Sequence, residues 1–246
     1  MLDKAKIKQC FSQAMANYDQ NAQAQQQINA HLVQLLATSS FSKVLEVGCG
    51  TGDLTRRMAQ QHHISHWTLN DLCDSRSYFD FLPSNQWEFC QGDIEQQDFE
   101  QSFDLIISAS VVQWLKDKEG FLQRCQQWLK PKGLLLFSSF LSDNLPEIQK
   151  ITGVHLNYPT ASQWQQWLAP YFDCLKWQQG SIKLHFPHPI NVLQHLKNTG
   201  VTATSQKGWT KGKLQRFCQQ YSHQFQEPQG VTLTYSPFYA LVRRTK

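Results

Sequence analysis

The 246 residues are enough for one large domain or for a core domain with an insertion, and a hydrophobic content of 41% supplies apolar surface to bury. No apolar run approaches the roughly 20 residues that span a bilayer, and the N-terminus lacks the apolar core of a signal peptide, so we expect a cytoplasmic protein without membrane contact. The seven cysteines are scattered and form no C-x-x-C pair, which argues against a disulfide framework and a zinc site, and we expect no bound metal.

The net charge of +4 is modest, but it is unevenly distributed. From Cys174 to Gln226 the sequence has no Asp or Glu, whereas it has seven Lys and Arg residues, which leaves −3 for the rest of the chain. A basic surface of this kind attracts acidic partners, although Lys-rich helices are often only solvated faces. Both interpretations stay open.

The first 40 residues carry apolar residues at helical spacing, and we expect one or two helices there. Strand-like and helix-like segments then alternate. Strands are expected at 44–47, 66–70, 87–90, 104–108 and 134–138, the last after a Pro-Lys-Gly turn, with helices at 53–61 and 118–129. This alternation predicts an α/β fold, with a Rossmann-like, doubly wound, mostly parallel sheet of seven strands that binds ligands at the carboxyl ends of its strands.

The pattern is less regular after residue 140. A helix is expected at 161–171, one or two strands at 173–186 and helical patches at 190–197 and 211–225, and the segment 231–243 is expected to end in a last strand, YALVRR. We therefore divide the chain into a helical N-terminal lid segment (1–40), a core (41–186 and 229–246) and a helical insertion before the last strand (187–228). The insertion would lie over the carboxyl ends of the parallel strands, where ligands bind in such sheets.

The stretch KVLEVGCGTGDL at 43–54 joins the first strand to a helix through Gly48, Gly50 and Gly52. Such a turn lets a ligand approach the main chain and presents N–H groups at a helix N-terminus. The spacing G-x-G-x-G differs from the G-x-G-x-x-G of dinucleotide sites, and no Lys follows as in a P-loop. Glu46 would repel a pyrophosphate but would attract a ligand that carries an ammonium and a sulfonium group, as S-adenosylmethionine does.

Two further acids follow the next two strands. Asp71 comes about 20 residues after the loop, where a carboxylate can accept hydrogen bonds from ribose hydroxyls. Asp93 follows the third strand and is placed to bind the exocyclic amine of adenine, with Ile94 against the ring. Cys49 lies inside the glycine loop, but no matching His or acid supports a nucleophile, so we expect a packing or backbone-contact role.

At this point the sequence resembles the class I S-adenosylmethionine-dependent methyltransferases. The motifs VLEVGCGTG, GDIE, FDLIISASVVQWL and LKPKGLLLFS are similar to theirs, in the same order and at similar intervals. Two departures are Pro-Lys-Gly in place of Pro-Gly-Gly and a segment after Asp71 without the usual hydrophobic pattern. The resemblance implies S-adenosylmethionine as cofactor and S-adenosylhomocysteine as product. The cofactor-binding residues that it implies are Glu46, Gly48, Cys49, Gly50, Gly52, Asp71, Leu72, Asp93, Ile94 and Ser108.

A narrower resemblance covers essentially the whole chain. The segments FSQAMANYDQNAQAQQQI, SASVVQWL, FSSFLSDNLPEI, HPINVLQHLKNTGV, GWTKGKL and TLTYSPFYALVRR are similar to segments of the malonyl-acyl carrier protein O-methyltransferases of biotin synthesis. This resemblance implies that Tyr18, with Gln25 as a further cofactor-binding residue, belongs to a lid over the methionine end of the cofactor. It also implies that Gln113 and Trp114 lie where the substrate meets the methyl group.

The narrower resemblance implies transfer of a methyl group from S-adenosylmethionine to the free carboxylate of a malonyl thioester, and the methyl ester then begins pimeloyl and biotin synthesis. A carboxylic acid is ionised at pH 7, so this nucleophile needs no general base, and we expect no catalytic acid or base. Acyl carrier proteins are acidic, so the resemblance implies malonyl-acyl carrier protein, or malonyl-CoA, as partner. The partner-binding residues would be Lys197, Lys207, Lys211, Lys213 and Arg216.

Three rival functions share parts of these features. A methyltransferase for another small carboxylic acid or a quinone precursor would have the same glycine loop and the same acids. An RNA methyltransferase could use the basic insertion, but base-directed enzymes often carry N-P-P-Y or a similar motif where this chain reads SASVVQW, so we expect no nucleic acid partner. A non-catalytic module that binds S-adenosylmethionine would keep the same pocket.

Overall fold

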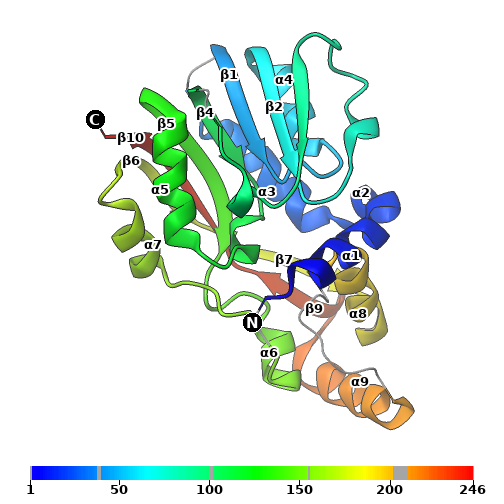
Figure 1. Cartoon of the computed structure of the whole chain (residues 1–246). Coiled ribbons are helices and arrows are strands. Elements are labelled where there is room, and N and C mark those ends of the chain that lie inside the picture. Colours follow the sequence, from blue (N-terminus) through cyan, green and yellow to red (C-terminus); the bar gives the residue numbers. More distant parts are fainter. Residues whose placement is uncertain (1, 38–39, 100–101, 155, 202–209, 246) are drawn as a thin grey trace.

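The structure is a computed structural model that describes all residues except 1, 38–39, 100–101, 155, 202–209 and 246. Its main sheet has seven strands in the order β3-β2-β1-β4-β5-β10-β6 (Figure 1). These strands are β1 (Ser40–Val47), β2 (His63–Asp71), β3 (Trp87–Gln91), β4 (Phe103–Ser108), β5 (Leu129–Phe140), β6 (Phe172–Gln179) and β10 (Pro237–Arg244). Strands β1 to β5 are parallel to their neighbours in this group, whereas β10 is antiparallel to both β5 and β6. The expected Rossmann-like α/β fold with a mostly parallel seven-stranded sheet is confirmed.

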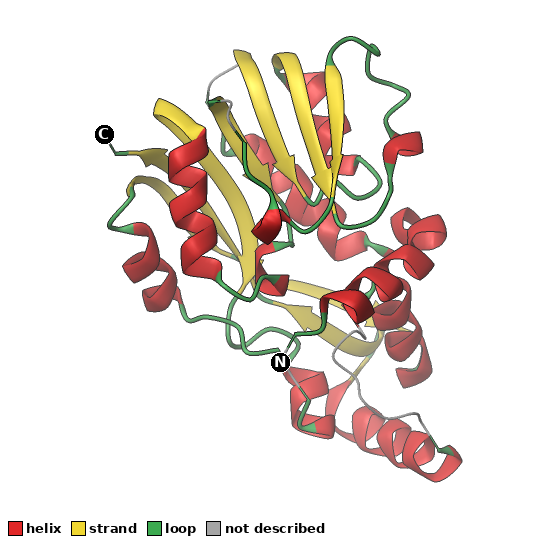
Figure 2. Ribbon diagram, in the orientation of Figure 1, coloured by secondary structure: helices red, strands yellow, loops and turns green. Residues whose placement is uncertain are grey.

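Hydrophobic side chains cover both faces of this sheet, because successive residues of a strand point to opposite sides. On β4, Leu105 and Ile107 pack on the face covered by α3 and α4, and Ile106 packs on the face covered by α5 and α7. These helices are α3 (Gln23–Gln34), α4 (Asp53–Gln61), α5 (Lys118–Trp128) and α7 (Ala161–Leu168). Figure 2 shows the two helix layers on either side of the sheet. The apolar run in β4 is continuous because this strand is buried on both faces.

The N-terminal residues form more helical segments than the expected one or two. Before α3 come α1 (Lys4–Ala14), the 3-10 turn η1 (Met15–Asn17) and α2 (Tyr18–Asn21). Asp3 caps α1, because its side chain accepts hydrogen bonds from the N–H groups of Ala5 and Lys6. Helix α1 also contacts α8 (Pro189–Asn198), so the N-terminal segment meets the region between β6 and β10 below the carboxyl ends of the parallel strands (Figure 1).

The chain between β6 and β10 adds a second, three-stranded antiparallel sheet in the order β7-β9-β8. Besides α8, this part contains β7 (Ile182–Phe186), α9 (Lys211–Phe225), β8 (Gln226–Glu227) and β9 (Gly230–Tyr235), and α6 (Pro146–Thr152) contacts it. The longest described helix, α9, has 15 residues, and no helix in the described part of the chain is long and apolar enough to cross a membrane. The expected last strand, YALVRR, lies in β10, whereas the residues before Ser236 form β9 and belong to the other sheet. The change of sheet occurs at Ser236, whose N–H donates to Asn144 Oδ1 and whose carbonyl accepts from Leu141 N–H.

Two departures of the sequence from the usual methyltransferase pattern have visible consequences. The segment after Asp71 forms only the 3-10 turn η2 (Arg76–Tyr78) between β2 and β3, and no α-helix. The Pro-Lys-Gly turn expected before the fifth strand lies inside β5, where Lys132 has a φ of 65° and the pairing with β4 shifts register. The turn is therefore an irregularity within a longer strand.

Candidate active site

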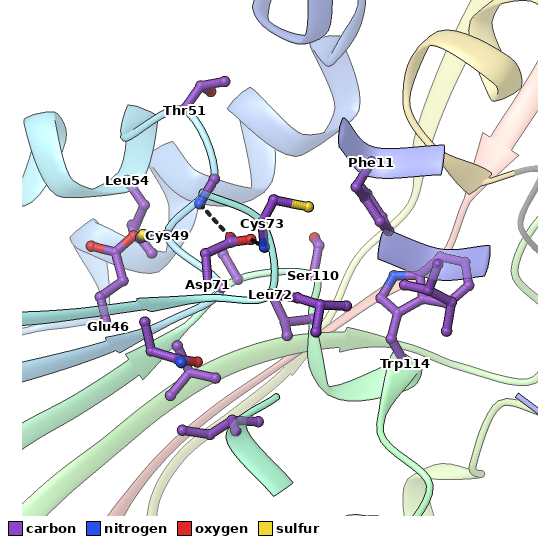
Figure 3. Close-up of a pocket in the computed structure, with 18 of the residues that line it drawn as sticks. Phe11, Glu46, Cys49, Thr51, Leu54, Asp71, Leu72, Cys73, Ser110 and Trp114 are labelled. Carbon is purple, nitrogen blue, oxygen red and sulfur yellow. Dashed lines mark hydrogen bonds between the residues drawn. The ribbon is translucent and has the colours of Figure 1, made fainter. Parts of the chain in front are cut away.

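A cavity lies at the carboxyl ends of the parallel strands, and α1, α2 and α3 also contribute to its lining (Figure 3). The lining includes these residues predicted from the sequence: Tyr18, Gln25, Glu46, Gly48, Cys49, Gly50, Asp71, Leu72, Asp93, Ile94 and Trp114. They come from the lid segment, from the carboxyl ends of β1 and β2, and from the turns that follow β1, β2, β3 and β4. The fold thus brings together segments up to about 100 residues apart, as a doubly wound sheet does at its ligand-binding edge.

The glycine loop forms one wall of this cavity. Gly48 and Gly50 have φ values of 71° and 51°, which only glycine adopts without strain. A Cβ on Gly48 would lie 2.2 Å from Val111 Cγ2, whereas a Cβ on Gly50 would meet nothing within 4 Å. The open side of Gly50 therefore leaves its main chain accessible to a ligand. Gly52, with a φ of 81°, is the N-cap of α4 and does not line the cavity.

Asp71 holds the loop against the end of β2. Its Oδ2 accepts a hydrogen bond from Gly50 N–H at 2.9 Å, and its Oδ1 accepts one from Cys73 N–H at 2.8 Å (Figure 3). Burial raises the pKa of this carboxyl, although backbone hydrogen bonds from Cys73, Gly50 and Leu72 oppose the shift. Each carboxylate oxygen can accept a second hydrogen bond, so Asp71 keeps acceptor capacity for a ligand.

Glu46 is only 1% exposed and also lines the cavity. Thr55 Oγ1 donates a hydrogen bond to its Oε2 at 2.7 Å. Burial raises the pKa of Glu46 to about 8, the hydrogen bond from Thr55 opposes this shift, and the nearby charges of Asp71 and Asp53 add to it. Without a nearby cation the carboxyl is therefore mostly protonated at neutral pH, in contrast to the charged group assumed in the sequence argument. A positively charged ligand beside it would favour the ionised form.

Asp93 and Glu95 share one cation from the lid. Lys4 Nζ, on α1, lies 3.0 Å from Asp93 Oδ1 and 2.5 Å from Glu95 Oε2, and all three side chains are less than a fifth exposed. Asp93 Oδ1 also accepts a hydrogen bond from Glu95 N–H at 3.2 Å. Lys4 therefore ties α1 to the turn after β3, beside the cavity that it helps to line. The sequence analysis missed Lys4, because a single lysine near the N-terminus carries no pattern.

A second contact joins the lid to the glycine loop. Thr51 Oγ1 donates a hydrogen bond to Asp19 Oδ1 at 2.5 Å. The neighbouring Tyr18 lines the cavity, and burial raises its pKa, with further contributions from the charges of Asp19, Asp71 and Asp53. Its phenol therefore stays protonated at neutral pH.

The turn after β4 contributes Ser110, which the sequence analysis did not single out. Ser110 lines the cavity with a φ of 58°, a left-handed conformation that costs a non-glycine residue energy and is often found at functional sites. Its N–H donates to Ser138 Oγ at 3.0 Å. Trp114 lies beyond it and packs edge-to-face on Phe11 of α1, with ring centroids 5.6 Å apart (Figure 3). Phe11 and Trp114 thus form an apolar wall between the lid and the sheet.

Three buried side-chain oxygens at this cavity have no hydrogen-bond partner. They are Gln25 Oε1, Asn29 Oδ1 and Ser110 Oγ. Leaving a buried acceptor unsatisfied costs about 1–3 kcal/mol, so such atoms usually mark the place of a ligand or water. The only cationic side chain among the described lining residues is Lys4, which is already paired. The lining therefore suits a ligand that brings hydrogen-bond donors and positive charge.

Two other predicted cofactor or substrate residues lie behind this lining. Ser108 is fully buried, and its Oγ donates to Val47 O at 3.0 Å, so its hydroxyl joins two strands of the sheet. Gln113 donates from Nε2 to Ser110 O at 2.6 Å and supports the turn that carries Ser110. Neither residue lines the cavity in the described structure.

The predicted partner-binding residues lie away from the cavity lining. Lys197 on α8 and Lys211, Lys213 and Arg216 on α9 are all exposed. Helix α9 lies far from the main sheet in Figure 1. Lys207 lies outside the described residues.

Sequence comparisons connect this chain with named methyltransferases. A family model described as a methyltransferase domain matches residues 45–137. A malonyl-[acyl-carrier protein] O-methyltransferase from Haemophilus influenzae is 42% identical over 247 residues, which cover 98% of this chain and 95% of that protein. A protein of the same name from Acinetobacter baylyi is 38% identical over 252 residues and covers 99% of this chain and 98% of its own length.

Solved structures agree on the fold at low sequence identity. A putative methyltransferase from Bacillus halodurans has a TM-score of 0.64 with 17% identity, over 89% of this chain and 99% of that chain. The N-methyltransferase NodS from Bradyrhizobium japonicum, solved with S-adenosyl-L-homocysteine, has a TM-score of 0.59 with 15% identity, over 98% of this chain and 100% of that chain. At these identities the likeness concerns the fold alone.

Proposed function

The chain belongs to the malonyl-[acyl-carrier protein] O-methyltransferases, and from that premise we propose that it transfers the methyl group of S-adenosylmethionine to the free carboxylate of a malonyl thioester on an acyl carrier protein. The product would be the methyl ester with which pimeloyl and biotin synthesis begins. The observation that carries the proposal is the acceptor-rich cavity, with the unpartnered oxygens of Gln25, Asn29 and Ser110 beside Glu46 and Asp71.

These residues fit S-adenosylmethionine better than a nucleotide phosphate. A pyrophosphate would need donors and cations, whereas an ammonium and a sulfonium group need acceptors and anions. In this proposal Asp71 accepts hydrogen bonds from the ribose, Asp93 and Ile94 bind the adenine, and Gln25 and Glu46 face the amino-acid end. When bound, the cofactor supplies an electrophilic methyl group on a positively charged sulfur.

The protein's contribution would be orientation and exclusion of water, since the malonyl carboxylate is ionised at neutral pH and needs no base. The titratable groups in the cavity support this assignment. Burial raises the pKa of the Cys49 thiol well above its usual value, and the phenol of Tyr18 is also held protonated. The apolar contact of Phe11 with Trp114 would keep water from the reacting carboxylate, which strengthens it as a nucleophile. Ser110 Oγ could donate a hydrogen bond to orient that carboxylate.

Identification of the methylated product tests the reaction. The protein is incubated with S-adenosylmethionine labelled in its methyl group and with malonyl-acyl carrier protein, malonyl-CoA or RNA in separate reactions. We expect label on the malonyl substrates and its release as methanol on mild base hydrolysis, as an ester requires. Growth of a biotin auxotroph that lacks this step, restored by the gene, would extend the result to the cell. Label on RNA, or base-stable label, would contradict the proposal.

The exposed lysines and arginine of α8 and α9 are our candidate docking surface for the acidic carrier protein. A basic surface raises the encounter rate with an acidic partner, and this effect weakens with salt. Replacing Lys211 and Lys213 with Glu should slow turnover of malonyl-acyl carrier protein about tenfold at low salt and leave turnover of malonyl-CoA much less affected. The matched control is Arg243→Glu, an exposed charge change near the C-terminal end of β10, and the C-terminus lies far from α9 in Figure 1. Equal effects of the two variants would refute the docking surface.

A further inference from the structure

A row of buried polar groups connects four elements behind the cavity. The row contains the carbonyl of Asn21 at the end of α2, His195 on α8, Tyr235 at the end of β9 and Gln25 on α3. His195 is 5% exposed, Tyr235 1% and Gln25 7%, so water contributes little to these groups. The ring nitrogen Nε2 of His195 lies 2.8 Å from the hydroxyl of Tyr235. Only Gln25 also lines the cavity.

The direction of the hydrogen bonds in this row follows from the state of His195. Burial lowers the pKa of His195 to about 4, although a hydrogen bond to the backbone of Asn21 opposes the shift, so the ring is neutral at pH 7. A neutral imidazole has one N–H, and a carbonyl can only accept. The N–H therefore points to the carbonyl of Asn21, and Nε2 is left as an acceptor. Consequently the hydroxyl of Tyr235 must donate its proton to Nε2 of His195.

This direction determines what Tyr235 can offer to Gln25. With its proton given to His195, the Tyr235 oxygen can only accept, and a hydrogen bond from the side chain of Gln25 opposes the rise that burial causes in the Tyr235 pKa. Of the amide of Gln25, only the NH₂ group can donate to that oxygen. The amide carbonyl of Gln25 is thereby turned the other way, and Oε1 is one of the three buried acceptors at the cavity without a partner.

We propose that His195 and Tyr235 are positioning residues for the cofactor, which act by fixing the orientation of the Gln25 amide so that its carbonyl oxygen accepts a hydrogen bond from the ammonium group of the bound S-adenosyl ligand. The inference rests on the proposed function, since it requires that ligand. It assigns a binding role to two residues that touch no cofactor and that lie on the small sheet and on α8, outside the methyltransferase sheet.

Two ligands and two Tyr→Phe variants distinguish this positioning role from a general effect on the structure. S-adenosylhomocysteine has the amino-acid end, whereas methylthioadenosine shares its nucleoside but lacks the amino acid. Tyr235→Phe removes one hydroxyl of the row, and the matched control Tyr221→Phe removes an equally buried hydroxyl of the same part of the chain, which donates to Thr232 O at 2.7 Å and does not line the cavity.

Calorimetry of both ligands with the full-length variants tests the proposal. Tyr235→Phe should weaken S-adenosylhomocysteine binding roughly three- to tenfold, Gln25→Ala should weaken it about tenfold or more, and the double variant should bind no more weakly than Gln25→Ala alone. Affinity for methylthioadenosine should not change in any of them, nor should Tyr221→Phe alter either affinity. Additive effects of Tyr235→Phe and Gln25→Ala, or equal losses for the two ligands, would overturn the positioning role. A wild-type protein that bound neither ligand would overturn the proposed function itself.

Discussion

Replacing Glu46 with Gln tests whether a protonated carboxyl lies in the wall of the cavity. Gln has nearly the same shape and can still accept the hydrogen bond from Thr55, but it cannot ionise. Burial raises the pKa of Glu46 from 4.5 to about 8. Because the folded-state pKa lies above the unfolded value, the stability that Glu46 contributes is complete below pH 4.5 and is lost as the pH rises through about 8.

The shift also sets the size of the effect on the free energy of unfolding. At about 1.4 kcal/mol per pKa unit, the full displacement corresponds to roughly 5 kcal/mol, of which about 3 kcal/mol is lost between pH 5.5 and 8.5. Urea unfolding of wild type and Glu46→Gln over this pH range isolates the contribution of Glu46 to the free energy of unfolding, because the two proteins share all other titrating groups. We expect wild type to lose about 3 kcal/mol relative to the variant. Two parallel stability curves would refute the reasoning.

The same group should couple cofactor binding to proton release. At pH 7 a carboxyl with a pKa of about 8 is roughly nine-tenths protonated, and a sulfonium group placed near it favours the charged form. Calorimetry of S-adenosylmethionine binding in buffers with different ionisation enthalpies measures the protons released. Wild type should release a substantial fraction of one proton, and Glu46→Gln should release close to none. Release that persists unchanged in the variant would show that another group is responsible.

Three further predictions concern the walls of the cavity. Gly50→Ala should lower the free energy of unfolding by only about 1 kcal/mol at its φ of 51°. It should weaken S-adenosylhomocysteine binding about tenfold or more, because the new Cβ would occupy open space in the cavity. Unchanged affinity by calorimetry would count against a ligand at this position. Gly48→Ala should instead destabilise the fold by about 2 kcal/mol or more in urea unfolding, since its Cβ would meet the side chain of Val111, and a stable variant would contradict that contact. Lys4→Met should speed dissociation of S-adenosylhomocysteine severalfold in stopped-flow at low salt, with a smaller difference at high salt, because it removes the ion pairs that tie α1 down. Equal dissociation rates at low salt would argue against this role.

Local patterns predicted much of the fold. The helix expected at 53–61 is α4 with the same limits, and the five expected parallel strands are β1 to β5 with extensions of a few residues. Strong periodicity and a turn of glycines are local properties of the chain, so they can be seen without tertiary structure. The change of sheet at Ser236 could not be predicted, because it depends on the strands with which β9 and β10 pair, and those partners are distant in the sequence.

The candidate site also has parts that could be predicted from the sequence and parts that could not. The glycine loop and the acids after β1 to β3 were predicted, since motif spacing places them at one edge of any doubly wound sheet. The ion pair of Lys4 with Asp93 spans 89 positions, and the contact of His195 with Tyr235 spans 40 positions. Contacts of this kind carry no local signal.

The sequence by itself thus determined the sheet, the order of its elements along the chain and the edge at which the cavity lies, because these depend on hydrophobic period and turn chemistry. Only the tertiary structure decided the state of the groups at that edge. Burial raises the pKa of Glu46, and in our proposal the amide of Gln25 has one orientation because residues from three other elements meet behind it. Burial and direction of hydrogen bonds arise only when distant segments pack together, and they are what gives the predicted residues their chemistry.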